Sequence, residues 1–151
     1  MQSLTRREAI VLGAVSTTTI LVGARGRARA TPADAAAQIA KFTGGKIPQT
    51  GQITIELPEI AENGNSIPLS VAVDSPMTAD NYVSDVLVIA EGNPWPGVAT
   101  FKFTPMSGRA EVATRIRLAG SQNVVVLAKS SNGGVLTAQR EVEVTIGGCG
   151  G

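Results

Sequence analysis

Residues 67–73, Ile-Pro-Leu-Ser-Val-Ala-Val, place a large apolar side chain at every second position. This period of two is typical of a β-strand with one buried face, because successive side chains point to opposite faces of a sheet. The alternation recurs in residues 53–57, 101–103, 112–118 and 142–146. Two denser apolar runs, residues 82–90 and 124–128, predict strands that are buried on both faces.

Turn-forming residues separate these runs, and together they indicate the fold class. They lie at positions 63–65, 74–76, 92–94, 107–108, 119–120 and 132–134. About seven short strands within about 100 residues, with frequent turns, predict an all-β, immunoglobulin-like β-sandwich. A β-barrel is the competing architecture. The inter-sheet disulfide of antibody domains is absent, because the chain has a single cysteine.

One short helix is expected ahead of the strands, over residues 32–43. Pro32 suits the first turn of a helix. Ala35, Ile39 and Phe42 recur at helical spacing, and the glycine pair at 44–45 ends the pattern. With this helix, the predicted folded domain covers residues 31–146.

Residues 1–30 have the features of a bacterial export signal. Arg6 and Arg7 precede a modest apolar run, residues 9–24, and a small-x-small cleavage pattern follows. The paired arginines favour the twin-arginine route. A membrane anchor is the alternative, but the run is shorter than the roughly 20 apolar residues that span a bilayer. We expect the mature chain to begin near Thr31 and to work in the periplasm.

The mature chain is mildly acidic and contains no histidine. Residues 31–151 hold 8 basic and 11 acidic residues, a net charge of −3. This balance argues against nucleic-acid binding, which needs clustered Lys and Arg. The lack of histidine removes the commonest metal ligand and the commonest general base. We therefore expect no catalytic residue, no metal site and no cofactor in this chain.

The last five residues, Gly-Gly-Cys-Gly-Gly, carry the only thiol. Gly147, Gly148, Gly150 and Gly151 surround Cys149. Glycine allows nearly any backbone angle, and five extended residues span about 17 Å. We expect a thin, flexible swinging arm over residues 147–151 that can enter a narrow channel in another protein. An incidental tail with a spare cysteine is the alternative.

The thiol has no activating neighbour in the sequence. No Lys or Arg lies within the arm, and the C-terminal carboxylate is close. A thiol becomes a strong nucleophile as a thiolate, which positive neighbours stabilise and negative neighbours disfavour. Activation of Cys149 is therefore expected to come from the enzyme that receives the arm, which favours a substrate carrier over a catalyst.

Three further groups of residues are candidates for binding. Glu59 and Glu62 lie beside a turn, where a solvated hairpin is favoured over a calcium loop because the acids are too few. Trp95, between two prolines, could anchor a partner or cap one end of the sandwich. The arginines of the region 109–117 could bind an anion such as sulfate, although a solvated strand face is the default.

Four segments resemble the SoxY family of sulfur-oxidising bacteria. They are residues 59–65 (Glu-Ile-Ala-Glu-Asn-Gly-Asn), 92–96 (Gly-Asn-Pro-Trp-Pro), 121–124 (Ser-Gln-Asn-Val) and 144–151 (Val-Thr-Ile-Gly-Gly-Cys-Gly-Gly). The last segment is the most specific, because it combines a motif, its terminal position and the absence of other cysteines. The similarity extends over the whole mature chain, and the twin-arginine signal also fits the family.

The resemblance implies a role in thiosulfate oxidation by the Sox pathway. Cys149 would be the site of covalent substrate attachment, and a SoxZ-like β-sandwich protein would be the heterodimer partner. A c-type haem enzyme would couple thiosulfate oxidatively to the thiol, and a manganese-dependent hydrolase would release sulfate. Where present, a molybdenum–haem enzyme would oxidise the remaining sulfane sulfur. The arm would carry the covalent sulfur intermediates between these enzymes.

Two other functions are compatible with parts of the sequence. A ubiquitin-like carrier would use the terminal Gly-Gly carboxylate, but its activation needs ATP, which the periplasm lacks. A structural or interaction domain would use Cys149 for an intermolecular disulfide. The first alternative predicts that Cys149→Ser is harmless, and the second predicts disulfide-linked dimers as the normal state.

Overall fold

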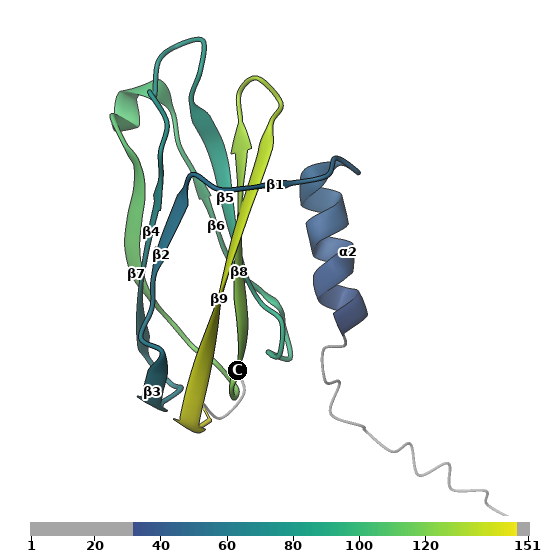
Figure 1. The fold of residues 1–151 in the computed structure, drawn as a ribbon, viewed down its shortest axis with the longest axis vertical. Helices are drawn as coiled ribbons and strands as arrows, with labels where there is room; N and C mark the ends of the chain where they lie inside the picture. The colour runs from purple at the N-terminus through teal and green to yellow at the C-terminus, as the bar shows by residue number, and fades with distance from the viewer. Residues whose placement is uncertain (1–31, 148–151) are drawn as a thin grey trace, which may run out of the picture.

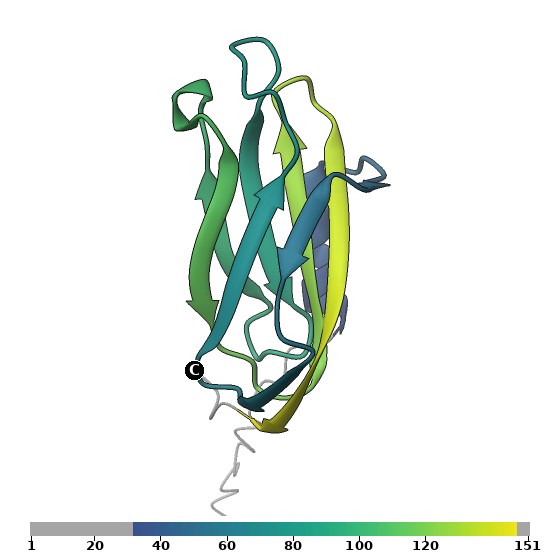
Figure 2. The same ribbon diagram turned by 60° about the vertical axis from the view of Figure 1, so that its left-hand side comes forward.

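The described part of the chain folds as a two-sheet β-sandwich with one α-helix (Figures 1 and 2). This computed structural model describes residues 32–147; the expectations for the export signal and for residues 148–151 lie outside the described residues. In chain order the elements are α2 (Pro32–Thr43), β1 (Gln49–Thr50), β2 (Ile53–Glu56), β3 (Ile60–Asn63), β4 (Ile67–Val73), β5 (Val83–Ala90), β6 (Gly97–Lys102), the 3₁₀ helix η1 (Pro105–Ser107), β7 (Ala110–Ile116), β8 (Gln122–Ser130) and β9 (Val135–Ile146). The predicted sandwich is confirmed, and the barrel alternative is wrong because the strands form two separate sheets.

The two sheets differ in size and in strand pairing. The larger sheet has the strand order β1-β9-β8-β5-β6, with β3 added beside β9, and the smaller has the order β2-β4-β7. Within the larger sheet, β5, β6, β8 and β9 pair antiparallel, whereas the short β1 and β3 pair parallel with β9. The long strand β9 thus has β8 along one edge, and β1 followed by β3 along the other.

The main core fills the space between the sheets. In β4, the residues at alternate positions from Ile67 to Val73 are all buried, as the period of two predicts. They meet the inward side chains of β5, β8 and β9, which include Val88, Val126 and Val142, each with no exposed surface. Each such side chain contributes about 1.5–3 kcal/mol when it leaves water, so this core is the main source of stability.

Helix α2 covers the outer face of the larger sheet (Figure 1). The helix occupies the predicted residues, and Ala35, Ile39 and Phe42 face the sheet as their spacing predicts. They pack against the outward side chains of β5, β8 and β9, namely Leu87, Ile89, Val125, Leu127 and Val135. This second cluster explains why the runs in β5 and β8 are apolar at every position.

The structure also contains strands that the alternation did not predict. Residues 32–147 form nine strands rather than about seven, because β1 and β3 are additional. The predicted hairpin at residues 59–65 is wrong: the turn exists, but β3 pairs with β9 rather than with β4. Strand β9 begins at Val135, well before the predicted residue 142, and β6 begins at Gly97 rather than at residue 101. Among residues 32–147, no helix has the length and hydropathy needed to cross a membrane.

Candidate functional site

The candidate site is the end of the sandwich where β9 finishes, one residue before the described part of the chain ends. Figure 2 shows the end of β9 lying beside β3 at the lower end of the molecule. Gly147 is the last described residue. The predicted attachment residue Cys149, the arm glycines 148, 150 and 151, and the signal residues Arg6 and Arg7 lie outside the described residues.

Strand β3 holds the last residues of β9 in place. Ala61 lies opposite Val144 and Asn63 lies opposite Ile146 in a parallel register. The backbone N–H of Gly64 donates to the carbonyl oxygen of Ile146 at 2.8 Å. At the start of β3, the Arg140 guanidinium and the Glu59 carboxylate approach to 3.4 Å, an exposed pair that adds little stability. Residues 59–65 therefore fix the position of the last residues of β9.

A second set of hydrogen bonds organises the loop between β7 and β8, residues 117–121. The side chain of Asn93 bridges this loop: its Nδ2 donates to the carbonyl oxygen of Arg117 at 2.8 Å, and its Oδ1 accepts from the N–H of Ala119 at 2.9 Å. Gln122 Nε2 donates to the same Oδ1 at 3.0 Å and to the carbonyl oxygen of Gly120 at 3.0 Å. Both polar atoms of the Asn93 amide are thus used to fix the loop.

The two sets of contacts meet at the end of β9. The N–H of Leu118 donates to the carbonyl oxygen of Gly64 at 2.8 Å, which joins the loop to the β3 turn. Ser121 Oγ accepts from the N–H of Val144 at 2.9 Å, which joins the loop to β9. A Cβ atom added to Gly147 would collide with the carbonyl oxygen of Ala119. Only glycine fits this close approach of backbone to backbone.

The four segments that carried the family resemblance meet at this end of the molecule, the last of them through its described residues 144–147. Residues 59–65 pair with the end of β9, residue 93 and residue 122 fix the 117–121 loop, and Ser121 bonds β9 directly. Sequence reasoning did not identify Asn93, Ser121, Gln122 or Gly64 as site residues. Their only signal was that they lie in the segments that carry the family resemblance, because the contacts join residues far apart in the chain.

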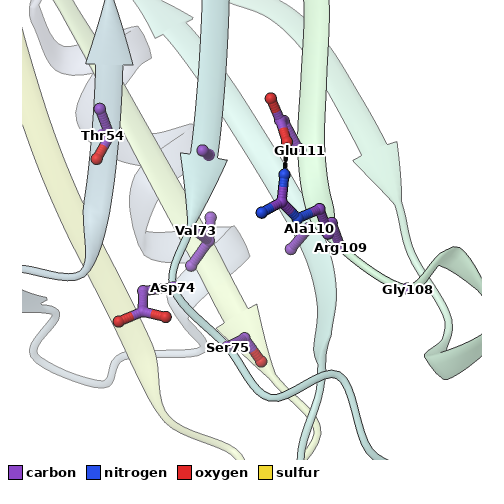
Figure 3. A pocket seen from close by; sticks show the side chains of 9 residues that line it. Thr54, Val73, Asp74, Ser75, Gly108, Arg109, Ala110 and Glu111 are labelled. Carbon is purple, nitrogen blue, oxygen red and sulfur yellow. Dashed lines mark hydrogen bonds and ion pairs between the residues drawn. The ribbon is translucent and has the colours of Figure 1, made fainter.

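The other sequence candidates are dispersed. Trp95 is 76% exposed in the β5–β6 loop, so the idea that it caps the sandwich is wrong, whereas its role as a partner anchor stays a prediction. Arg109 lies at the start of β7 and pairs with Glu111 at 3.5 Å, beside a hollow on the outer face of the smaller sheet (Figure 3). Arg115, six residues along the chain and thus about 20 Å away, donates to Ser66. The arginines do not form one anion site.

The described residues at this end supply a frame rather than a set of reacting groups. Asn93, Ser121 and Gln122 all direct their polar atoms at backbone groups. Within residues 32–147, no group of three or more His, Cys, Asp or Glu side chains could hold a metal ion. The arrangement can fix the direction in which the chain leaves the sandwich.

Comparison with known proteins finds one matching family model. The model of the family described as sulfur oxidation protein SoxY matches residues 39–149. The solved structure of the sulfur carrier protein SoxY from Chlorobium limicola f thiosulfatophilum is 34% identical, with a TM-score of 0.63 over 77% of this chain and 100% of that chain. The comparison with curated proteins found no match.

More distant structures share the fold. A superoxide reductase from Ignicoccus hospitalis is 20% identical, with a TM-score of 0.56 over 62% of this chain and 80% of that chain. A superoxide reductase from Nanoarchaeum equitans is 13% identical, with a TM-score of 0.54 over 64% and 100% of the two chains. At these identities the likeness concerns the sandwich alone.

Proposed function

Since the chain belongs to the SoxY family of sulfur carrier proteins, we propose that it holds sulfur intermediates covalently on Cys149 and presents them to the enzymes of thiosulfate oxidation. One observation carries the proposal: the family match runs through residue 149, which is the chain's only cysteine. The end of β9 supports it, because the sandwich fixes the chain up to two residues before that thiol.

The proposed chemistry begins with an oxidative coupling. The Cys149 thiolate and thiosulfate join through a new sulfur–sulfur bond, and two electrons pass to a c-type haem enzyme. A manganese-dependent enzyme then hydrolyses the sulfur–sulfur bond to the terminal sulfonate. The sulfonate leaves as sulfate, and two protons are released. A persulfide remains on Cys149 for a further oxidation where a molybdenum–haem enzyme is present.

The carrier's own contribution is positional. The hydrogen bonds around the end of β9 engage Asn93, Ser121 and Gln122 with neighbouring groups of the protein itself. A carrier gains from this arrangement, because a thiol without its own activating group stays inert until an enzyme receives it. The reacting groups then belong to each enzyme in turn.

The location and the partners are part of the same proposal. The twin-arginine signal would deliver the folded chain to the periplasm, where the carrier would encounter thiosulfate. A SoxZ-like protein would form the heterodimer, and the three enzyme types named above would bind the arm in succession. An exposed thiol in this oxidising compartment is at risk of unwanted oxidation, which covalent loading with substrate would limit.

A genetic exchange tests the proposal. In a thiosulfate-oxidising host that lacks its own copy, the wild-type chain should restore thiosulfate-dependent oxygen uptake, and Cys149→Ser should abolish it. Circular dichroism of the purified variant should be unchanged, because residues 53–144 supply the core of the sandwich. Full oxygen uptake with Cys149→Ser would refute the thiol carrier. Disulfide-linked dimers as the normal state on non-reducing gels would favour the structural alternative.

A further inference from the structure

We propose that Gly147 is the fixed root of the arm, held against the β7–β8 loop rather than free to turn. The sequence places four equivalent glycines around Cys149. The structure distinguishes the first of them, because Gly147 lies against the backbone of the β7–β8 loop. The inference rests on the proposed function for its meaning, but its structural part can be tested without any sulfur substrate.

The first support is the continuity of hydrogen bonding up to the root. The carbonyl oxygen of Ile146, which forms the peptide group that leads into Gly147, accepts from the N–H of Gly64. Gly64 in turn accepts from the N–H of Leu118. A peptide group tied in this way cannot rotate without breaking a bond of about 1 kcal/mol and opening the β3 turn.

The second support is steric. A Cβ at position 147 would meet the Ala119 carbonyl oxygen at a separation that real Cβ atoms do not show, and this neighbour is backbone rather than a flexible side chain. The loop cannot simply move away, because Asn93 holds the N–H of Ala119 and the carbonyl oxygen of Arg117. We call Gly64, Asn93, Ala119, Ile146 and Gly147 the arm seat.

The arm seat sets how far the thiol can travel. From a fixed Gly147, the Cα of Cys149 lies two residues away and reaches about 7 Å at most. An enzyme must therefore bring its reacting centre close to this end of the sandwich, or receive the arm while in contact with it. Asn93 is then a positioning residue: it touches no substrate and acts by fixing the place and direction from which the arm starts.

Two matched alanine substitutions in the full chain test the root. Gly147→Ala should speed amide hydrogen exchange at Gly64 and Leu118 by about tenfold, as expected when a hydrogen-bonded network opens locally. Gly148→Ala adds the same methyl group one residue later and should leave these rates unchanged. Equal effects of the two substitutions on exchange, or none from Gly147→Ala, would overturn the proposal.

A second pair tests the positioning role. A nitroxide attached to Cys149, the only cysteine, should become more mobile in Asn93→Ala than in the wild type. The control is Asn132→Ala, which removes a local turn bond to Gly134 in the β8–β9 loop, at the other end of the sandwich. It should leave the nitroxide spectrum unchanged. An unchanged spectrum in Asn93→Ala would refute the positioning role.

The functional consequence is measured with the same variants. In Asn93→Ala, kcat/KM for enzymatic loading of Cys149 from thiosulfate should fall several-fold, while a small maleimide still labels the thiol at the wild-type rate. Unchanged loading despite a more mobile nitroxide would show that the arm seat does not serve transfer. Absence of loading in the wild type would instead refute the proposed function and leave the exchange result standing.

Discussion

Asn93 and Trp95 stand two residues apart in the β5–β6 loop and have opposite surroundings. Both polar atoms of the Asn93 amide form hydrogen bonds to the backbone of residues 117–119, so its role is internal to the fold. Trp95 is 76% exposed, whereas the neighbouring Pro96 is fully buried and closes this part of the core. A large exposed aromatic side chain close to the arm seat is a suitable anchor for a partner.

Trp95→Ala should therefore weaken the binding of a partner and leave the fold intact. The melting temperature should change by no more than about 1–2 °C, because surface substitutions usually alter stability by less than about 0.5 kcal/mol. The Kd for the SoxZ-like protein or for a loading enzyme should rise at least about fivefold, as for an interface residue worth more than about 1 kcal/mol. Unchanged affinity for all of these proteins would remove Trp95 from the interface.

At the scale of elements, helix α2 covers an apolar surface of the larger sheet that would otherwise be exposed to water. Its contact is narrow: Ala35, Ile39 and Phe42 touch the sheet, and Lys129 places its ammonium 5.0 Å from the centre of the Phe42 ring. Without the helix, the outward side chains of β5 and β8 would form an exposed apolar patch of the kind that promotes association. The helix is thus part of the folded domain.

Two neighbouring alanines in α2 test this packing. Ala35 is 2% exposed and Ala36 is exposed, so aspartate has very different costs at the two positions. Ala35→Asp should lower the free energy of unfolding by about 2–4 kcal/mol, because it forces a charge into an apolar contact or detaches the helix. Ala36→Asp should change it by less than about 0.5 kcal/mol. Equal denaturant midpoints for the two variants would contradict the observed packing.

The elements that the sequence predicted are those whose pattern is local. The alternation in β4 and the helical spacing in α2 follow from the faces that each element buries, so both could be found from a few residues. Strand β3 could not: only Ala61 is buried among its four residues, and its strand form depends on pairing with β9, about 80 residues later. The first half of β9 is half-buried and mixed in polarity, so it lacks a clear period.

The same distinction applies to the candidate site. The prediction for Cys149 rests on the local motif and on the absence of other cysteines, and it stays a prediction. The arm seat could not be predicted, since Asn93, Ala119 and Gly147 meet only after the sandwich has formed. Turn chemistry alone explains an asparagine in a Gly-Asn-Pro turn, so the sequence gives no sign that Asn93 also holds the 117–121 loop.

At the scale of the whole molecule, the proposed export route and the proposed carrier function depend on each other. The proposal requires a chain that folds before it is loaded, and the sandwich has its own core from residue 53 to residue 144. The twin-arginine route carries folded proteins, so Arg6→Lys with Arg7→Lys should keep the protein in the cytoplasm. Fractionation followed by mass spectrometry should find wild-type periplasmic protein starting near Thr31. Undiminished export of the double variant would contradict this route.

The central claim is that sulfur is carried on Cys149, and intact-mass spectrometry tests it most directly. Protein purified natively from cells that are oxidising thiosulfate should carry extra mass in units of sulfur and sulfonate, located on residue 149. A reductant should remove this mass, because thiolates attack sulfur–sulfur bonds, and Cys149→Ser should never show it. An unmodified mass from actively oxidising cells, or an adduct that persists in Cys149→Ser, would contradict the account.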